Sequence, residues 1–298
     1  MDFFQASIIF AFLAMICWGV GDFFTQKTVR RIGDFKALLW INLLGGLALT
    51  PFVIKDFPLI FQGWNLVSLI ILSLIQLAYG LFLFKAFDKG KLSVVEVVMI
   101  GELPLTIILG LIFFGERLSG LQLLVVIAII IGVFLVSKSR STWRDKVRTF
   151  FGRRKFVWEK GVIMATLAVL FSAAYNFFTA LNSREISAFT AVWFPWLLSS
   201  LLLLVYVFFK EDFKGFLKTS RKSSRVIITA SLLDTLGWLF FALAVVSEDL
   251  SIITAIVSGY AVLSMFLGVR FNKEKIGGWQ YAGAAIVLTG AIVMSFLI

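Results

Sequence analysis

The chain has 298 residues, of which 60% are hydrophobic and 15% are charged. Soluble domains carry about 25% charged residues, so this composition excludes a water-soluble globular protein. The sequence has no histidine and a single cysteine, Cys17, which excludes histidine-based catalysis, an intramolecular disulfide and the usual zinc or iron–sulfur clusters. It also lacks a glycine-rich phosphate loop. We therefore expect no enzymatic activity, no cofactor and no metal.

Ten apolar stretches follow one another along the chain, and each is long enough to cross a hydrocarbon core of about 30 Å. Lipid cannot satisfy an open backbone, so these stretches are predicted to be helices. Residues 121–136 show none of the alternation that a barrel strand needs. The predicted spans are 7–25, 37–54, 66–84, 92–114, 120–137, 161–181, 187–209, 226–247, 250–269 and 276–297.

The basic residues are sorted by side, and this predicts the orientation. All but three of the 28 Lys and Arg residues lie in or beside the loops that follow the odd-numbered spans; the exceptions are Lys55, Arg117 and Arg184. Basic loops are retained in the cytoplasm. We therefore expect an integral protein of the plasma (inner) membrane, with cytoplasmic basic loops and both termini outside. The net charge of +11 is then an orientation signal, and we expect membrane lipids but no nucleic acid as partners.

The longest polar break, at residues 138–160, marks the midpoint of the chain. Apolar and aromatic residues recur there at helical spacing between arginines, which fits a short helix on anionic headgroups. A solvated basic linker fits equally well, so both interpretations stay open. The predicted division is a first repeat at 1–138, a basic cytoplasmic linker at 139–159 and a second repeat at 160–298.

An internal repeat crosses this midpoint. A shift of 158 residues aligns 86–137 with 244–295 without a gap, and a shift of 154 residues aligns the first span of each half. Leu and Ala matches are common in apolar sequence, whereas Gly, Gln and Glu matches in one register are not. The informative matches are Gly101/Gly259, Gly110/Gly268, Glu116/Glu274, Gly120/Gly278, Gln122/Gln280 and Gly132/Gly290.

Each repeat holds five predicted spans, and an odd number places the second copy upside down relative to the first. The predicted fold is an all-α membrane protein with ten transmembrane helices arranged as two inverted five-helix repeats. Many secondary transporters have this architecture, in which two similar halves give alternating access to a central site.

Several motifs resemble the EamA family of the drug/metabolite transporter superfamily. They are Gly101-Glu102-Leu103-Pro104, Gly115-Glu116-Arg117-Leu118, Leu121-Gln122, Asn272-Lys273-Glu274-Lys275, Trp279-Gln280 and Cys17-Trp18-Gly19. The resemblance covers the whole chain. It implies that helices 1–4 and 6–9 surround a central cavity while helices 5 and 10 lie at the periphery. Relatives move amino acids, sugars, nucleotide derivatives and drugs, so the substrate stays open.

Two features depart from the family pattern. Leu103 separates Glu102 from Pro104, where the family has Glu followed at once by Pro. A kink at Pro104 is therefore rotated by about 100°, and we predict a hinge at this residue. Relatives also commonly keep both termini in the cytoplasm, whereas the basic residues here predict the reverse.

Carboxylates inside a membrane cost about 2.5–3.5 kcal/mol on insertion scales and usually face the protein interior. Glu102 holds the family's Glu position and is expected to line the cavity as a substrate contact or proton carrier. For Asp234 in span 8, functional and structural roles fit equally well. Asp22 is expected to reach the interface or pair with Lys27. Glu96 lies about 240° from Glu102 on an unbroken helix, so it too is expected at the interface.

The uncharged candidates for a polar, aromatic-walled cavity are Asn42, Gln76, Tyr79, Asn176, Trp193, Trp238 and Tyr260. Tyr260 occupies the repeat position of Glu102, which supports its choice. Glu116 and Glu274 lie at helix ends beside Arg117 and Lys275. For these two glutamates we expect local ion pairs or helix-terminus contacts rather than substrate binding.

The predicted function is secondary transport of a small polar metabolite or drug-like solute, with export favoured, by alternating access in a monomer or weak homodimer. Without a nucleotide-binding motif, ATP is not the direct energy source. Proton coupling through Glu102 or Asp234 and facilitated diffusion both fit the sequence. The alternatives are a lipid flippase and an accessory membrane subunit without a soluble cargo. A membrane enzyme is disfavoured, because the basic loops lack His, Cys or paired catalytic carboxylates.

Overall fold

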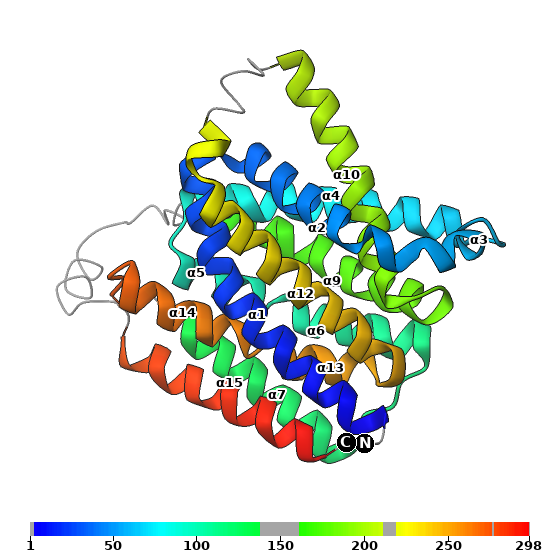
Figure 1. Cartoon of the computed structure of the whole chain (residues 1–298). Helices are drawn as coiled ribbons and strands as arrows, with labels where there is room; N and C mark the ends of the chain where they lie inside the picture. Colours follow the sequence, from blue (N-terminus) through cyan, green and yellow to red (C-terminus); the bar gives the residue numbers. More distant parts are fainter. Residues whose placement is uncertain (1–2, 138–160, 211–218, 276, 298) are drawn as a thin grey trace.

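The computed structural model describes residues 3–137, 161–210, 219–275 and 277–297, and within these ranges the regular structure is entirely helical. The predicted basic linker at 139–159, with its two open interpretations, lies outside the described residues. Residues near both ends of the chain come together at one end of the molecule (Figure 1). This fits an even number of membrane crossings.

The first repeat begins with long helices and continues with a broken one. The fourth predicted span, 92–114, is divided into two short α-helices and a π-helical turn. The elements are α1 (Phe3–Ile32), α2 (Asp34–Val53), η1 (Ile54–Asp56), α3 (Phe57–Ile60), α4 (Asn65–Lys89), α5 (Leu92–Met99), α6 (Glu102–Leu109), η2 (Gly110–Phe114) and α7 (Gly120–Ser137).

The second repeat follows the same order, and its fourth span is also divided in two. The elements are α9 (Val162–Glu185), α10 (Ala188–Lys210), α12 (Ser224–Ser247), α13 (Leu250–Val257), α14 (Tyr260–Phe271) and α15 (Gly278–Phe296).

Seven helical segments in the described part of the chain are long and apolar enough to cross a membrane. They correspond to α1, α2 to α3, α4, α9, α10, α12 and α13 to α14. Three further apolar helices, within Glu102–Phe114, Gly120–Gly132 and Tyr281–Met294, are shorter. The chain is therefore a helical integral membrane protein, while ten complete crossings remain part of the proposal below.

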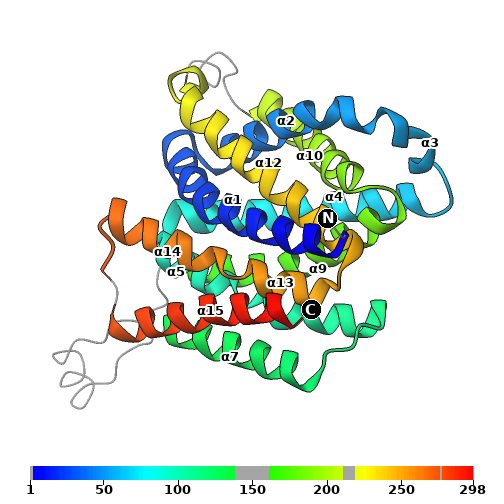
Figure 2. The ribbon, with the colours of Figure 1, turned by 60° about the horizontal axis from the view of Figure 1, so that its bottom comes forward.

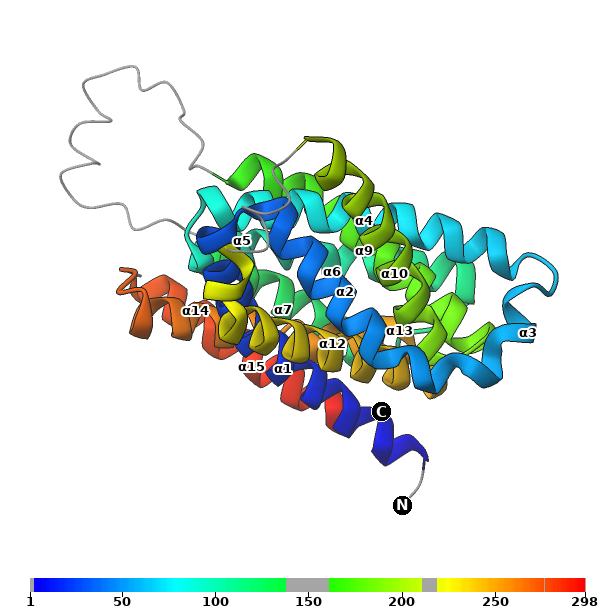
Figure 3. The same cartoon turned by 45° about the horizontal axis from the view of Figure 1, so that its top comes forward.

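Helices of one repeat pack mainly on helices of the other. The α1 helix lies along α12 and α4 lies along α9, which are equivalent pairs when the two repeats are exchanged. The α2 helix packs on its own counterpart α10 (Figure 3). This exchange of equivalent contacts is the arrangement expected from two copies related by an approximate twofold axis.

The counterpart helices α7 and α15 form a separate pair at one edge of the molecule (Figure 2). They run antiparallel, because Gln122 at the start of α7 donates to the carbonyl of Leu297, 3.3 Å away, at the end of α15. The matched glycines permit their close approach: a Cβ on Gly132 would lie 2.9 Å from the carbonyl oxygen of Gly283, and one on Gly290 would lie 2.6 Å from Ile129. The structure thus places the fifth helix of each repeat at the periphery.

The breaks in the fourth helices fall at matching positions. Ile100 and Gly101 separate α5 from α6, and Ser258 and Gly259 separate α13 from α14. Pro104 is the third residue of α6, in the first turn, where a missing N–H costs little. The second copy has a break without a proline. The break therefore precedes Pro104 instead of forming at it, and a hinge role for Pro104 remains a prediction.

Candidate functional site

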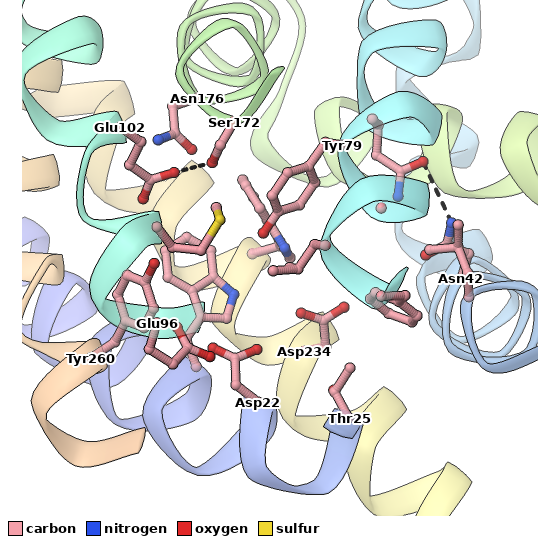
Figure 4. Close-up of a pocket in the computed structure, with 18 of the residues that line it drawn as sticks. Asp22, Thr25, Asn42, Tyr79, Glu96, Glu102, Ser172, Asn176, Asp234 and Tyr260 are labelled. Carbon is pink, nitrogen blue, oxygen red and sulfur yellow. Dashed lines mark hydrogen bonds between the residues drawn. The ribbon is translucent and has the colours of Figure 1, made fainter. Parts of the chain in front are cut away.

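A cavity lies between the two repeats, near the middle of the long helices (Figure 4). Residues from both repeats line it, with contributions from α1, α2, α4 and α5–α6 on one side and α9, α10, α12 and α14 on the other. Eight of the nine site candidates chosen from the sequence are among them: Asn42, Gln76, Tyr79, Glu102, Asn176, Asp234, Trp238 and Tyr260. The structure therefore gathers the candidates in one place, while their role in binding or proton coupling remains a prediction.

Glu102 occupies the first turn of α6 and faces α9. Its carboxylate accepts hydrogen bonds from Ser172 and Asn176, which lie one turn apart on that helix. The Asn176 amide also lies 3.4 Å from the hydroxyl oxygen of Thr106. Glu102 is 8% exposed. A buried carboxylate is thus held by polar groups of the opposite repeat, which supplies the hydrogen bonds that a buried charge requires.

Two further carboxyl groups, those of Asp22 and Glu96, line the same cavity. Asp22 of α1 and Glu96 of α5 face each other in Figure 4, with their carboxyl groups close together. Two carboxylates this close repel each other, so the arrangement favours one proton held between the two groups. Asp234 of α12 is a fourth carboxyl on the cavity wall and lies close to Asp22 in the same view.

Two sequence predictions about these acids are wrong. Asp22 neither reaches the interface nor pairs with Lys27: it lines the cavity, and the Lys27 ammonium lies 3.9 Å from the centre of the Phe23 ring. Glu96 is only 1% exposed and lines the same cavity as Glu102. The helix does not continue from Glu96 to Glu102, so the angle of about 240° for an unbroken helix does not describe their relative directions.

Aromatic rings form much of the remaining wall. Trp238 lies at their centre, with ring centroids 4.1 Å from Tyr175, 4.6 Å from Trp18 and 6.1 Å from Tyr79. The Trp18 ring also lies 5.9 Å from that of Tyr260. The rings come from both repeats, so the cavity shape depends on how the two copies pack.

Two tryptophans of α10 have different surroundings. Trp196 lines the cavity and donates from its indole nitrogen to the Tyr175 hydroxyl at 3.0 Å. Trp193 does not line the cavity: its indole donates to the Thr50 hydroxyl at 3.0 Å, so its selection as a site candidate was wrong. Both tryptophans lie three residues apart on an apolar helix, and no neighbouring residue marks which of the two faces the cavity.

Amides form the last corner of the cavity. The Gln76 side-chain oxygen accepts from the Ser199 hydroxyl at 2.5 Å and lies 3.4 Å from the Asn42 amide nitrogen. These residues come from α4, α10 and α2 in turn. The corner is therefore polar and uncharged, in contrast to the acidic wall formed by α1, α5 and α12.

Two glutamates connect the repeats at opposite ends of the molecule; of the local ion pairs or helix-terminus contacts expected from the sequence, the structure shows contacts with helix termini. Glu116, which follows η2, accepts from the backbone N–H groups of Leu250 and Ser251 at the start of α13, at 2.7 and 3.0 Å. Glu274, which follows α14, accepts from Leu92 and Ser93 at the start of α5, at 3.1 and 3.0 Å. We call these contacts the Glu116 clasp and the Glu274 clasp. Each satisfies free helix N–H groups of the other repeat.

The local backbone explains how each clasp forms. Gly115 and Lys273, at matching positions just before the glutamates, are both left-handed, with φ of 66° and 56°. This conformation reverses the chain after the helix. Gly110 and Gly268 leave room for the carboxylates, because a Cβ would come within 2.3 Å of Glu116 Oε2 and 2.9 Å of Glu274 Oε2.

Comparison with known proteins agrees with this arrangement. The sequence model of the EamA-like transporter family matches the chain twice, at residues 5–138 and 159–296. The chain belongs to this family. The resemblance inferred from the motifs is therefore confirmed, and the chain is a membrane transporter of the drug/metabolite type.

Individual relatives of this EamA-like protein say little about its substrate. An uncharacterized protein of Methanocaldococcus jannaschii, MJ1333.1, is 28% identical over 136 residues, which cover 45% of this chain and 98% of the relative. A solved crystal structure matches with a TM-score of 0.66 over 98% of this chain and 97% of its own, at 16% identity. This likeness supports the fold alone.

Proposed function

We propose that this EamA-like protein is a secondary transporter that moves a small solute across the plasma membrane through the central cavity. In this proposal ten helices cross the bilayer, the basic loops face the cytoplasm and both termini lie outside. The solute is a polar metabolite or drug-like molecule, and transport runs outward. The binding groups are the eight predicted residues together with Asp22 and Glu96.

The observation that carries the proposal is the composition of the cavity wall. Four carboxyl groups lie between the repeats on helices that are otherwise apolar. Intramembrane carboxyls are costly and commonly serve substrate or proton pathways. Contributions from both repeats matter here, since a site at the interface of two inverted copies changes shape when the copies move relative to each other.

The two clasps support an alternating mechanism. The Glu116 clasp joins the repeats at the end near the chain termini, and the Glu274 clasp joins them at the end with the basic loops. In the proposed cycle one clasp opens while the other holds, so that the cavity meets one side of the membrane at a time. Each clasp links the end of one broken helix to the start of the other. Opening therefore displaces α5–α6 relative to α13–α14.

Protons are the proposed coupling ion. The facing carboxyl groups of Asp22 and Glu96 favour one shared proton, and Glu102 is bound by neutral donors rather than by a basic side chain. A solute that takes the place of this proton links its own movement to the proton gradient. No nucleotide-binding motif occurs in the sequence, which leaves ion or solute gradients as the energy source.

The test is efflux from proteoliposomes loaded with a mixture of amino acids, sugars, nucleosides and amines, analysed by mass spectrometry. We expect at least one compound to leave faster than from protein-free vesicles. Glu102→Gln should slow its efflux about tenfold, because the Gln side chain cannot carry a proton or negative charge. Glu185→Gln is the matched control, since Glu185 is an exposed residue at the end of α9.

Wild-type efflux from the Glu102→Gln protein at every pH would remove Glu102 from the mechanism. Movement of labelled lipid analogues between the two leaflets, without efflux of soluble compounds, would favour a flippase over the proposed solute transporter.

A further inference from the structure

The ionisable carboxyl groups on the cavity wall have no basic side chain beside them. Asp22, Glu96, Glu102 and Asp234 line it, and its lining residues include no Lys or Arg. The nearest basic side chains of the same helices are directed elsewhere: Lys27 lies over the Phe23 ring, Arg30 donates to the carbonyl of Gly90, and Lys85 pairs with Asp34. The wall therefore holds four acidic groups, and none of its lining residues supplies a positive charge to balance one that ionises.

Three buried polar atoms of the lining lack a hydrogen-bond partner. They are Glu96 Oε1, the Thr25 hydroxyl and the Trp18 indole nitrogen, on side chains that are 1%, 2% and 8% exposed. Unsatisfied polar groups at such depth are rare in proteins and need a reason. While its carboxyl is ionised, Glu96 Oε1 is an acceptor and cannot donate a hydrogen bond. An N–H group of a bound molecule meets that need.

Thr25 and Glu96 lie on the same side of the cavity as Asp22 and Asp234 (Figure 4). Trp18 lies beside them on α1 and contacts Trp238 and Tyr260. Aromatic faces attract cations, with Trp as the strongest. The unpartnered acceptor, the carboxyl groups and the aromatic rings therefore converge on one region of the wall.

We propose that the transported solute is a small organic cation whose protonated primary or secondary amine binds among Asp22, Glu96 and Asp234, against the rings of Trp18 and Trp238. This rests on the proposed transport function and specifies its substrate class. The ammonium donates to Glu96 Oε1 and takes the place of the proton held between Asp22 and Glu96. That proton leaves to the solvent on the side that the cavity faces.

Other solute classes fit the wall less well. A phosphate or carboxylate would face four acidic groups without a basic side chain to bind it. A sugar would use the rings and amides but leave the carboxyl charges unbalanced. A bound metal ion is also disfavoured, since the described residues contain no group of three or more side chains placed to hold one.

The first experiment measures binding of three molecules that share a skeleton and differ in charge: 2-phenylethylamine, 2-phenylethanol and 3-phenylpropionate. Binding to the purified full chain is followed by quenching of tryptophan fluorescence and by thermal shift. We expect the amine to bind about tenfold tighter than either analogue, because charge-assisted hydrogen bonds are the strongest that the wall can make. Equal or tighter binding of the alcohol or the acid would overturn the proposal.

A fourth probe, the N,N,N-trimethyl derivative of the amine, separates the effect of the positive charge from that of the N–H donor. It keeps the positive charge but cannot donate an N–H to Glu96. We expect it to bind several-fold more weakly than the primary amine. Tighter binding of the trimethyl compound would contradict the assignment of Glu96 Oε1 as the acceptor.

Variants then locate the site. Glu96→Gln and Asp234→Asn should each weaken amine binding about tenfold, whereas Glu185→Gln should leave it unchanged. If Glu96→Gln does not fold, Trp238→Phe and Trp238→Leu offer a second route: Phe should retain more binding than Leu, because it keeps an aromatic face. Unchanged amine binding in both the Glu96 and Asp234 variants, with the protein folded, contradicts the proposed site.

Different outcomes would contradict the proposed transport function and the proposed class of substrate. If the amine binds but never crosses proteoliposome membranes, the proposed transport function is wrong and the binding class stands. If a neutral or anionic compound is transported and its efflux depends on Glu102, transport stands and the cationic class is wrong.

Discussion

The Glu116 clasp and the Glu274 clasp occupy matching places in the two repeats but differ in strength. Besides two backbone N–H groups, Glu116 accepts from the Ser251 hydroxyl at 2.5 Å and lies 3.8 Å from the guanidinium of Arg184. Glu116 is 8% exposed, whereas Glu274 is partly open to solvent. Charge-assisted hydrogen bonds are stronger where burial lowers the local dielectric constant. The difference indicates that the end near the chain termini is closed more firmly than the basic end.

The Arg184 contacts add to this difference. Arg184 donates to the carbonyls of Val245 and Glu248, both at 2.8 Å, and its guanidinium lies 4.3 Å from the centre of the Phe114 ring. Its repeat counterpart, Arg30, donates to the carbonyl of Gly90 at 2.6 Å and is exposed. The two ends of the molecule thus share one plan, and the end near the termini has more contacts.

The largest expected effect comes from removing the stronger clasp. Glu116→Ala leaves two helix N–H groups without an acceptor and removes the ion-pair partner of Arg184. We therefore expect a loss of about 3 kcal/mol in unfolding free energy. The measurement is the denaturation midpoint of purified protein in detergent. An unchanged midpoint would show that this clasp does not stabilise the folded protein.

Glu274→Gln should have a smaller effect, about 1 kcal/mol, because the amide oxygen still accepts one hydrogen bond and the group is partly solvated. Its main consequence is opening of the basic end. Thr25 and Thr179 are buried residues at matching repeat positions, so each can be replaced by cysteine in a Cys17→Ala background. Glu274→Gln should raise thiol labelling of Thr25→Cys more than that of Thr179→Cys. The converse pattern is expected for Glu116→Gln, and equal changes at both sites would contradict separate clasps.

The glycines beneath the clasps give a graded comparison. A Cβ at Gly110 would lie 2.3 Å from Glu116 Oε2 and 2.9 Å from the Ser251 hydroxyl, whereas one at Gly268 would lie 2.9 Å from Glu274 Oε2. We expect Gly110→Ala to cost about 2 kcal/mol and Gly268→Ala about 1 kcal/mol, since the buried carboxylate has less room to move. Thermal unfolding of the two variants side by side measures the difference, and a larger loss at Gly268 would reverse our ranking of the ends.

The smallest effect is expected beside the Glu116 clasp. Burial raises the pKa of Asp249, and the charge of Glu116 raises it further. A raised pKa in the folded state means that stability falls as pH rises from the ordinary Asp range through the folded pKa. Asp249→Asn removes this loss. We expect the melting temperature of the variant to gain on that of wild type as the pH rises above the ordinary Asp pKa of about 4, and a constant difference would contradict the coupling.

Much of the fold follows from local features of the sequence. Apolar runs predicted the helices, and matched Gly and Glu residues at a shift of 158 predicted that Glu116 and Glu274 occupy equivalent places. The cost of buried polar groups selected Glu102, Asp234 and the amides, which all line the cavity. The helical regions and the cavity-lining positions follow from composition, spacing and, for Glu102, the family motif, while the role of these residues stays a prediction.

The rest depended on contacts between distant segments. Glu96 was misplaced because a helix was extended through a break at Gly101, and the sequence around Gly101 does not state which way the next segment turns. Asp22 was misplaced because its partner lies on α5, far along the chain. The exchange of capping groups between repeats was also beyond reach, since each glutamate contacts a helix more than 130 residues away.

Glu102 and Tyr260 hold the same position in the two repeats, yet one is an acid and the other a phenol. An assembly of two identical single-repeat subunits with exact twofold symmetry would place the same side chain on both sides of its axis. Joining the copies in one polypeptide removes that constraint, so a mutation in one copy no longer changes the symmetry-equivalent position in the other. Specialisation of the two walls thus becomes available to selection, as the acid at Glu102 and the phenol at Tyr260 show.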